Sequence, residues 1–208
     1  MQNHAQKWLV VGLLGLSGLG GVAAVQAQTT AAPTQNAASD TQRDANQQQR
    51  IDQGLKSGQL STRQASNLEQ REANLDRTEQ RDMRNGPMTK AENAQIQRMQ
   101  NRDSAAIYKD KHDAITGNPN SASSRRLQAD AQRNANQEQR LANGVKSGQL
   151  TNREDARMQG RQAHVDHMEH VAGTNNGRVG PREQKRIRRA DNRDSKRIQR
   201  VRHNKAKR

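Results

Sequence analysis

The chain contains one unit twice. The segment KSGQL at 56–60 recurs unchanged at 146–150, an offset of 90 residues. The segment NRDS at 101–104 recurs at 192–195 with an offset of 91, so one residue has been inserted between the two matches. Both copies must fold in the same way, and the duplication therefore restricts the chain to an internally repeated architecture.

Composition limits what each copy can build. The 208 residues include no Cys and no Phe, the hydrophobic fraction is 29%, and the net charge is +15. Low hydrophobicity combined with high net charge predicts a small apolar core. The absence of Cys excludes disulfides, thiolate metal sites and a lipoprotein anchor.

The N-terminus has the pattern of an export signal. Lys7 precedes an apolar run over residues 9–19, and Val25 and Ala27 are small residues at the −3 and −1 positions of a cleavage site. We predict a signal peptide at residues 1–27 and a mature protein that is periplasmic or secreted, without a transmembrane span.

The mature chain is predicted to be all-α, with two tandem copies of a three-helix unit that form helical hairpins or loose bundles. The predicted divisions are a disordered leader, repeat 1, a disordered linker, repeat 2 and a basic tail, at residues 28–39, 40–113, 114–129, 130–204 and 205–208. We expect thin aliphatic seams and frayed, Gln-rich first helices.

Helix boundaries are marked by capping patterns. Thr89-x-x-Glu92 and Thr151-x-x-Glu154 are capping boxes, in which the Thr side chain and the Glu side chain each satisfy a backbone N–H. Pro181 suits the first turn of a helix. These signals place the start of the third helix of unit one, and of the second and third helices of unit two.

Four turns share the spacing of the second half of an EF-hand loop. Each has a Gly followed six residues later by Gln or Glu, at Gly58/Gln64, Gly86/Glu92, Gly148/Glu154 and Gly177/Glu183. No loop has an Asp at the first, third or fifth position, where calcium needs acidic oxygens. Calcium binding is therefore not expected, and a glycine stop followed by a capping box explains the spacing.

A histidine cluster distinguishes the second copy. The candidate metal ligands are His164, His167, Met168 and His170, which could hold Cu, Ni or Zn. The positions of these histidines in the first copy hold Asn74, Arg77 and Gln80. Three histidines at steps of three fan over about 120° of a helix surface, so a solvated polar face is the competing interpretation and no cofactor is assigned.

The second copy also ends in a cationic helix. Residues 182–208 contain 13 Lys or Arg and three acidic residues. The predicted polyanion-binding residues are Arg182, Lys185, Arg186, Arg188, Arg189, Arg193, Lys196, Arg197, Arg200 and Arg202. The expected partner is an anionic envelope component such as lipopolysaccharide or an anionic lipid surface. Nucleic acid is not expected, because the segment lacks aromatic residues for base stacking.

No catalytic motif is recognisable. The chain lacks a Cys nucleophile, a Gly-x-Ser-x-Gly elbow, a His-Glu-x-x-His motif and a Gly-rich phosphate loop. Carboxylates are scattered among Arg on the faces of the predicted helices, which we interpret as surface ion pairing. The sequence therefore predicts a protein without enzymatic activity.

The SGQLT-x-x-E turn at 147–154 and the NRDS helix that closes at His203 resemble a group of exported bacterial helical-repeat proteins to which no activity is attached. A fainter resemblance is to Spy/CpxP-type periplasmic chaperones, which share an L-T-x-x-Q motif, matched by Leu150 and Thr151 but not by Glu154. The leading hypothesis is a protein that binds an anionic envelope partner through its C-terminal helix. The alternative is a Spy-like chaperone or a metal-buffering stress protein.

Overall fold

The computed structural model describes residues 31–204, and the side chains from residue 36 onward. This part of the chain contains six helices and no strand, which confirms the all-α prediction. The helices are α1 (Ala31–Ser57), α2 (Thr62–Met83), α3 (Lys90–His112), α4 (Ala122–Lys146), α5 (Asn152–Asn175) and α6 (Pro181–Arg202). The predicted signal peptide and the basic tail at 205–208 lie outside the described residues.

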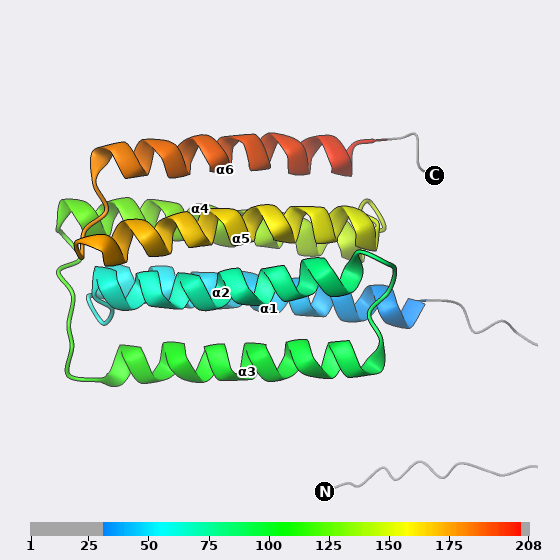
Figure 1. Ribbon diagram of the computed structural model, residues 1–208, viewed down its shortest axis with the longest axis horizontal. Coiled ribbons are helices and arrows are strands. Elements are labelled where there is room, and N and C mark those ends of the chain that lie inside the picture. The colour runs from blue at the N-terminus through cyan, green and yellow to red at the C-terminus, as the bar shows by residue number, and fades with distance from the viewer. Residues whose placement is uncertain (1–30, 205–208) are drawn as a thin grey trace, which may run out of the picture.

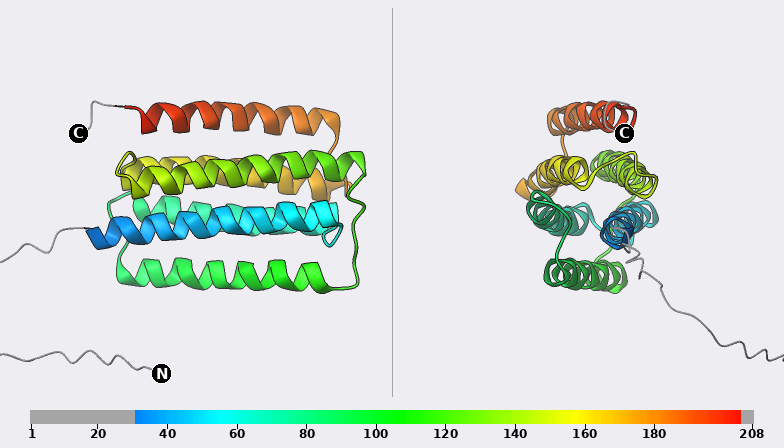
Figure 2. Two further views of the ribbon diagram at one scale, coloured as in Figure 1. Left: turned by 180° about the vertical axis from the view of Figure 1, so that it is seen from behind. Right: turned by 90° about the vertical axis from the view of Figure 1, so that its right-hand side faces the viewer.

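The helices form four layers (Figure 1). The α1–α2 pair packs against the α4–α5 pair, α3 covers the outer side of the first pair, and α6 covers the outer side of the second. The end-on view in Figure 2 shows the two central pairs stacked between the two single outer helices. The two copies of the sequence unit therefore form one bundle and not two separate ones.

The two copies are related by a pseudo-two-fold arrangement. Helix α1 packs on α4, and α2 packs on α5, so each helix faces its own counterpart in the other copy. Contacts between α1 and α4 show that the pairing is antiparallel. Gln42 and Gln139 exchange amide hydrogen bonds of 2.9 and 2.8 Å, and further along α1 Lys56 donates to Gln132, which lies earlier on α4. Each copy completes the core of the other, which explains how units with thin apolar seams can fold.

The predicted capping boxes at Thr89 and Thr151 are confirmed, and Ser61 forms another at the start of α2. Ser61, Thr89 and Thr151 each accept a hydrogen bond from the backbone of the residue three positions later, and the side chain of that residue bonds back to the cap. Gly58 and Gly148 end the preceding helices with φ of 76° and 70°, a conformation that favours glycine. The repeated KSGQL segment is thus the turn between the first two helices of each copy.

The leader and linker predictions are wrong in extent. Helix α1 begins at Ala31, inside the predicted leader, and Ala37 is buried. Helix α4 begins at Ala122, inside the predicted linker, and Ser121 caps it by accepting from the Ser124 amide. The rest of the linker packs on the first turn, where the Gly117 amide donates to the Gly58 carbonyl over 2.8 Å. Burial against the neighbouring copy stabilises helix beyond the boundaries that local composition indicates.

The repeated NRDS segment attaches the third helix of each copy. Ser104 on α3 accepts from Arg50 of α1, and Ser195 on α6 accepts from Arg140 of α4. The adjacent carboxylates follow the same pattern, with Arg71 2.8 Å from Asp103 and Arg161 3.1 Å from Asp194. The motif therefore has a structural role that is identical in the two copies.

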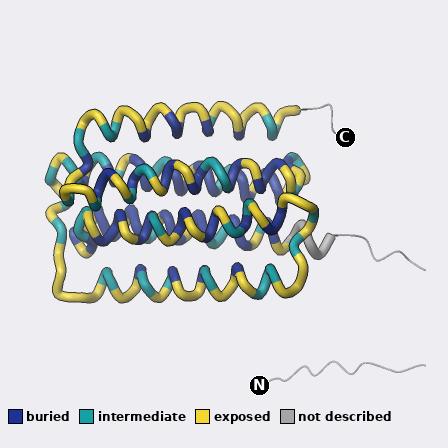
Figure 3. Tube along the Cα trace, viewed as in Figure 1, coloured by how far each residue is buried: buried dark blue, intermediate teal, exposed yellow. Residues whose placement is uncertain are grey.

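Two apolar clusters stabilise opposite ends of the bundle. One contains Ile51, Leu55 and Leu127, and the other contains Leu141 and Val145. Between these positions, the inward faces of the four central helices carry Asp, Glu, Asn and Gln, and Figure 3 shows that these helices are buried along much of their length. The first helices of the two copies are thus core elements, contrary to the prediction that they fray. No described helix has an apolar stretch long enough to cross a membrane.

Candidate functional site: a cationic groove over an acidic core

Charges are sorted between the interior and the surface. Of the 21 acidic residues in the sequence, 17 are buried. No described lysine or arginine is buried. The prediction that the carboxylates form surface ion pairs is therefore wrong. Most carboxylates lie in the interior of the bundle, and the outer surface is left strongly cationic.

One cluster of buried carboxylates belongs to the first copy. Asp44 on α1 and Asp76 and Glu79 on α2 place a carboxylate oxygen each within 4.8 Å of the other two. Gln100 of α3 reaches this cluster and donates to Asp44 Oδ1 over 2.8 Å. Asp44 Oδ2, Asp76 Oδ2 and both carboxylate oxygens of Glu79 accept no hydrogen bond from the described residues.

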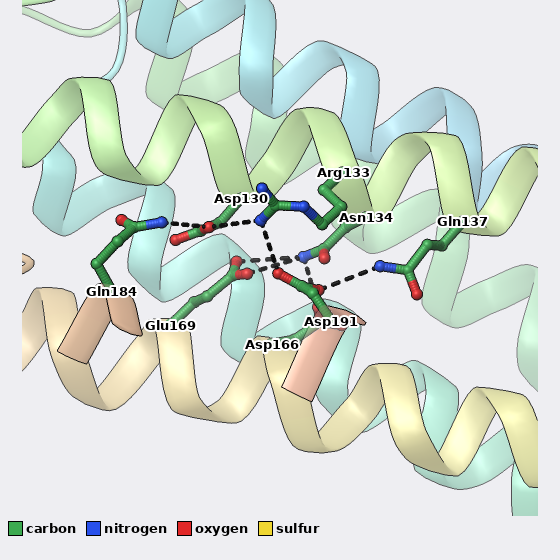
Figure 4. A network of polar contacts seen from close by, with 8 residues as sticks. All are labelled: Asp130, Arg133, Asn134, Gln137, Asp166, Glu169, Gln184 and Asp191. Atoms are coloured by element: carbon green, nitrogen blue, oxygen red, sulfur yellow. Dashed lines mark hydrogen bonds and ion pairs between the residues drawn. The ribbon is translucent and has the colours of Figure 1, made fainter. Parts of the chain in front are cut away.

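The second copy has the corresponding cluster with one change. Asp166 and Glu169 on α5 occupy the positions of Asp76 and Glu79, but Asn134 on α4 replaces Asp44. Asn134 Nδ2 donates to Asp166 over 3.0 Å and to the two oxygens of Glu169 over 3.1 and 3.2 Å (Figure 4). This amide therefore pairs with two carboxylates. Their counterparts in the first copy, Asp76 and Glu79, have no comparable donor among the described residues.

An arginine also reaches the interior of the second copy. Arg133 Nη1 lies 3.1 Å from Asp130 and 2.9 Å from Asp191, and Figure 4 shows it between these carboxylates of α4 and α6. Its counterpart in the first copy, Arg43, donates to Asn101 at the surface over 2.7 Å. The interior of the second copy therefore contains its own compensating charge, and that of the first does not.

Burial changes the protonation of these carboxylates. Loss of solvent raises the pKa of Glu69 to about 8 and of Asp155 to about 7. The pKa values of Asp44, Asp76 and Glu79 are raised well above their ordinary range, first by burial and then by neighbouring carboxylates. Protonated carboxyls near neutral pH are one way in which this interior avoids repulsion.

The histidine cluster lies along the α5–α2 contact. The ring of His167 is exposed and bonds to the Gln70 side chain, and His170 is half-buried and bonds to the Ser66 carbonyl, with ring centroids 6.3 Å apart. His164 is exposed, whereas Met168 packs against an apolar cluster. Among residues 36–204, the groups of three or more His, Asp or Glu with ligand atoms within 4.8 Å contain no histidine. Metal binding at His164, His167, Met168 and His170 stays a prediction.

A cationic groove runs between α5 and α6. Six of the residues that line it are basic, and we call these six the groove cations: Arg157, Arg161, Arg193, Lys196, Arg197 and Arg200. Glu154, which also lines the groove, is buried and its carboxylate accepts from the backbone of Thr151. Arg161 is paired with Asp194, so the charge that faces solvent comes mainly from the other five groove cations.

The first copy has the same helices but not the same charge. The positions of Arg157, Lys196 and Arg197 are held there by neutral residues, Asn67, Ala105 and Ala106. The pairing of Arg161 with Asp194 is preserved as Arg71 with Asp103. The cationic groove is therefore a property of the second copy alone and is not needed to build the fold.

The structure places the ten predicted polyanion-binding residues along α6. Nine are exposed, and Arg202 is half-buried with its Nε donating to Gln149 over 3.0 Å. Four of the ten, from Arg193 to Arg200, are groove cations; Arg157 and Arg161 of α5 were missed. Sequence comparison between the copies could have identified Arg157, because it replaces an Asn. The apolar residues of α6, such as Ile187 and Ile198, are buried in the bundle and leave the cationic face outward.

Comparisons with known family models, curated proteins and solved structures find no match for this chain. The resemblances to exported helical-repeat proteins and to Spy/CpxP-type chaperones thus stay predictions.

Proposed function

We propose that this is an exported, non-enzymatic helical protein that binds phosphate-bearing anionic surfaces of the cell envelope through the α5–α6 groove. The proposal rests on the clustering of the six groove cations in the second copy. At three of the six equivalent positions, the first copy has a neutral residue. Arginine and lysine at this density attract phosphate groups such as those of lipopolysaccharide and anionic lipids.

The arrangement of the apolar residues favours binding at the surface over insertion. The apolar stripe of α6 is used in packing against the two core clusters, through Ile187, Ala190 and Ile198. A helix whose apolar face is buried in its own protein has none left to enter a bilayer. Attraction between charges is therefore the expected source of affinity, and it should weaken with added salt.

The first copy supplies matched substitutions for a test. The triple variant Arg157→Asn, Lys196→Ala and Arg197→Ala introduces the residues found at the equivalent places of the first copy. A control variant removes the same charge from the exposed face of α3, by Arg98→Gln, Arg102→Gln and Lys109→Gln. Net charge is equal in the two variants, so a difference between them reports the groove.

Binding is measured by co-sedimentation with vesicles of phosphatidylglycerol or of phosphatidylcholine, and with lipopolysaccharide. At about 1 kcal/mol for each cation near an anionic surface, the groove variant should bind phosphatidylglycerol about 100-fold more weakly than the wild type. The α3 variant should lose much less. Equal losses in the two variants would show that net charge alone is responsible, and wild-type binding to phosphatidylcholine alone would contradict the proposal.

A further inference from the structure

The three carboxylates of the first copy have the geometry of a ligand set for a small cation. The ligand oxygens of Asp44, Asp76 and Glu79 lie within 4.8 Å of one another. Oxygens bound to one ion at 2.3–2.6 Å can lie up to about 5 Å apart, so one ion can contact all three carboxylates. The three residues are 2%, 2% and 1% exposed, and the two helices that present them are rigid elements of the core.

The second observation is that these oxygens have no donors. Four oxygens of the cluster, Asp44 Oδ2, Asp76 Oδ2 and both of Glu79, are buried and accept no hydrogen bond within the described part of the chain. Buried polar atoms in folded proteins are nearly always paired, because an unpaired one costs free energy. Unpaired lone pairs from three side chains that converge on one point favour a positively charged ligand there.

The equivalent position in the second copy differs in how its carboxylates are paired. Asp166 and Glu169 also form a group of three with Glu69, with ligand oxygens within 4.8 Å of one another. There Asn134 replaces the carboxylate of Asp44, and its amide donates to both Asp166 and Glu169. One negative charge is removed and a donor is supplied by the same substitution. The two copies therefore differ at this point, because Asp76 and Glu79 receive no such donor from the described part of the chain.

We propose that Asp44, Asp76 and Glu79 bind one hard divalent cation of the Ca²⁺, Mg²⁺ or Mn²⁺ class inside the bundle. The ligands are all carboxylate oxygens, which these ions prefer to the softer Cu or Zn. This site is distinct from the predicted histidine cluster and from the turns with EF-hand spacing, whose Gln and Glu side chains act as helix caps.

Protons compete with the cation for these oxygens. The charged groups around the cluster are mainly neighbouring carboxylates from both copies, namely Asp40, Glu72, Glu138, Asp155 and Asp166. Arg43 acts in the opposite direction on Asp44, with a smaller effect. Burial raises the pKa of the ligands themselves, so cation binding must release protons. Affinity should therefore rise with pH.

The test uses the full chain, stripped with a chelator, and measures binding of Ca²⁺, Mg²⁺ and Mn²⁺ by titration calorimetry and native mass spectrometry near pH 8. Because the site is buried, the protein is also refolded from urea in the presence of each cation. The expected stoichiometry for the wild type is one cation per chain, with a rise in the thermal midpoint. Absence of binding to all three ions at millimolar concentration in both arms would overturn the proposal.

The two copies provide reciprocal variants. Asp44→Asn gives the first copy the residue of the second, and should abolish binding while circular dichroism shows an intact fold. Asn134→Asp gives the second copy the residue of the first, and should raise the stoichiometry from one to two, with Glu69 near the new site. A stoichiometry of one in Asn134→Asp, or unchanged binding in Asp44→Asn, would refute the assignment. The two variants are separate proteins, so a folding failure in one leaves the test with the other intact.

Discussion

Glu69 offers a quantitative test of the acidic interior. It is fully buried on α2, and Gln48 Nε2 donates to its Oε2 over 2.9 Å. Its counterpart in the second copy is Gln159, which donates to Glu138. The substitution Glu69→Gln therefore introduces the residue found at the equivalent position of the other copy, and it removes one titrating group.

The sign of the effect follows from the raised pKa. Burial raises the pKa of Glu69 from 4.5 to about 8, so the folded state binds its proton more tightly than the unfolded state. The stability associated with this proton is fully present below about pH 4.5 and is lost as the pH rises through about 8. At about 1.4 kcal/mol per pKa unit, the loss from Glu69 reaches about 4 kcal/mol by pH 8, a large part of the stability of a small domain.

The assay is urea unfolding followed by far-UV circular dichroism, in chelator, at about pH 5 and pH 8. The wild type should be less stable at the higher pH, contrary to proteins whose carboxylates have lowered pKa values. Glu69→Gln should have nearly wild-type stability at about pH 5 and should be more stable by up to about 4 kcal/mol at pH 8. Equal unfolding free energies of variant and wild type at pH 8 would refute the reasoning.

Two further predictions concern the packing of the copies. Gly173→Ala should destabilise the fold by about 1–3 kcal/mol in thermal unfolding, because the added methyl group would overlap Ser66 of α2. Gly160→Ala is the control and should destabilise the fold less, because its methyl group meets only the end of the flexible Gln80 side chain. Arg140→Ala should loosen α6 by about 1–2 kcal/mol, because it removes the bonds to Ser195 Oγ and O at 2.7 and 3.0 Å. Amide hydrogen exchange should then become faster in α6 and not in α3. The variant Arg50→Ala should make exchange faster in α3 and not in α6. An equal increase in both helices in either variant would contradict this role of the NRDS segment.

Local signals in the sequence were sufficient for the helix starts that carry a capping box. Ser61, Thr89 and Thr151 were recognisable as caps because capping depends on residues within one turn. The beginnings of α1 and α4 were missed, because burial against the other copy is a long-range effect that composition does not report. The face-to-face packing of the copies could not be read from a duplication, which is equally compatible with two separate bundles.

Only part of the candidate sites could be predicted from the sequence. The cationic α6 followed from counting charges, but its partner Arg157 on α5 needed the packing of α5 on α6. The prediction of surface ion pairs was wrong because Glu69, Glu72, Asp76 and Glu79 are interspersed with Arg along α2, as on a solvated helix. Their steps of three, four and three residues place them on one face of α2, and this stripe was the available signal. Charged residues on a helix normally indicate solvent, so the pattern favoured the wrong face.

The central claim is that the carboxylates are inside the bundle and the cations outside, and carbon-13 NMR of the Asp and Glu carboxyl groups tests it most directly. In the cation-free protein, the account predicts that buried carboxyls such as Glu69 and Asp155 titrate near pH 8 and pH 7. Glu92 at the start of α3, whose pKa is lowered by hydrogen bonds from Thr89, should titrate below its ordinary value of 4.5. Titration of all 21 acidic residues near their ordinary values would contradict the account, because it would place the carboxylates in solvent.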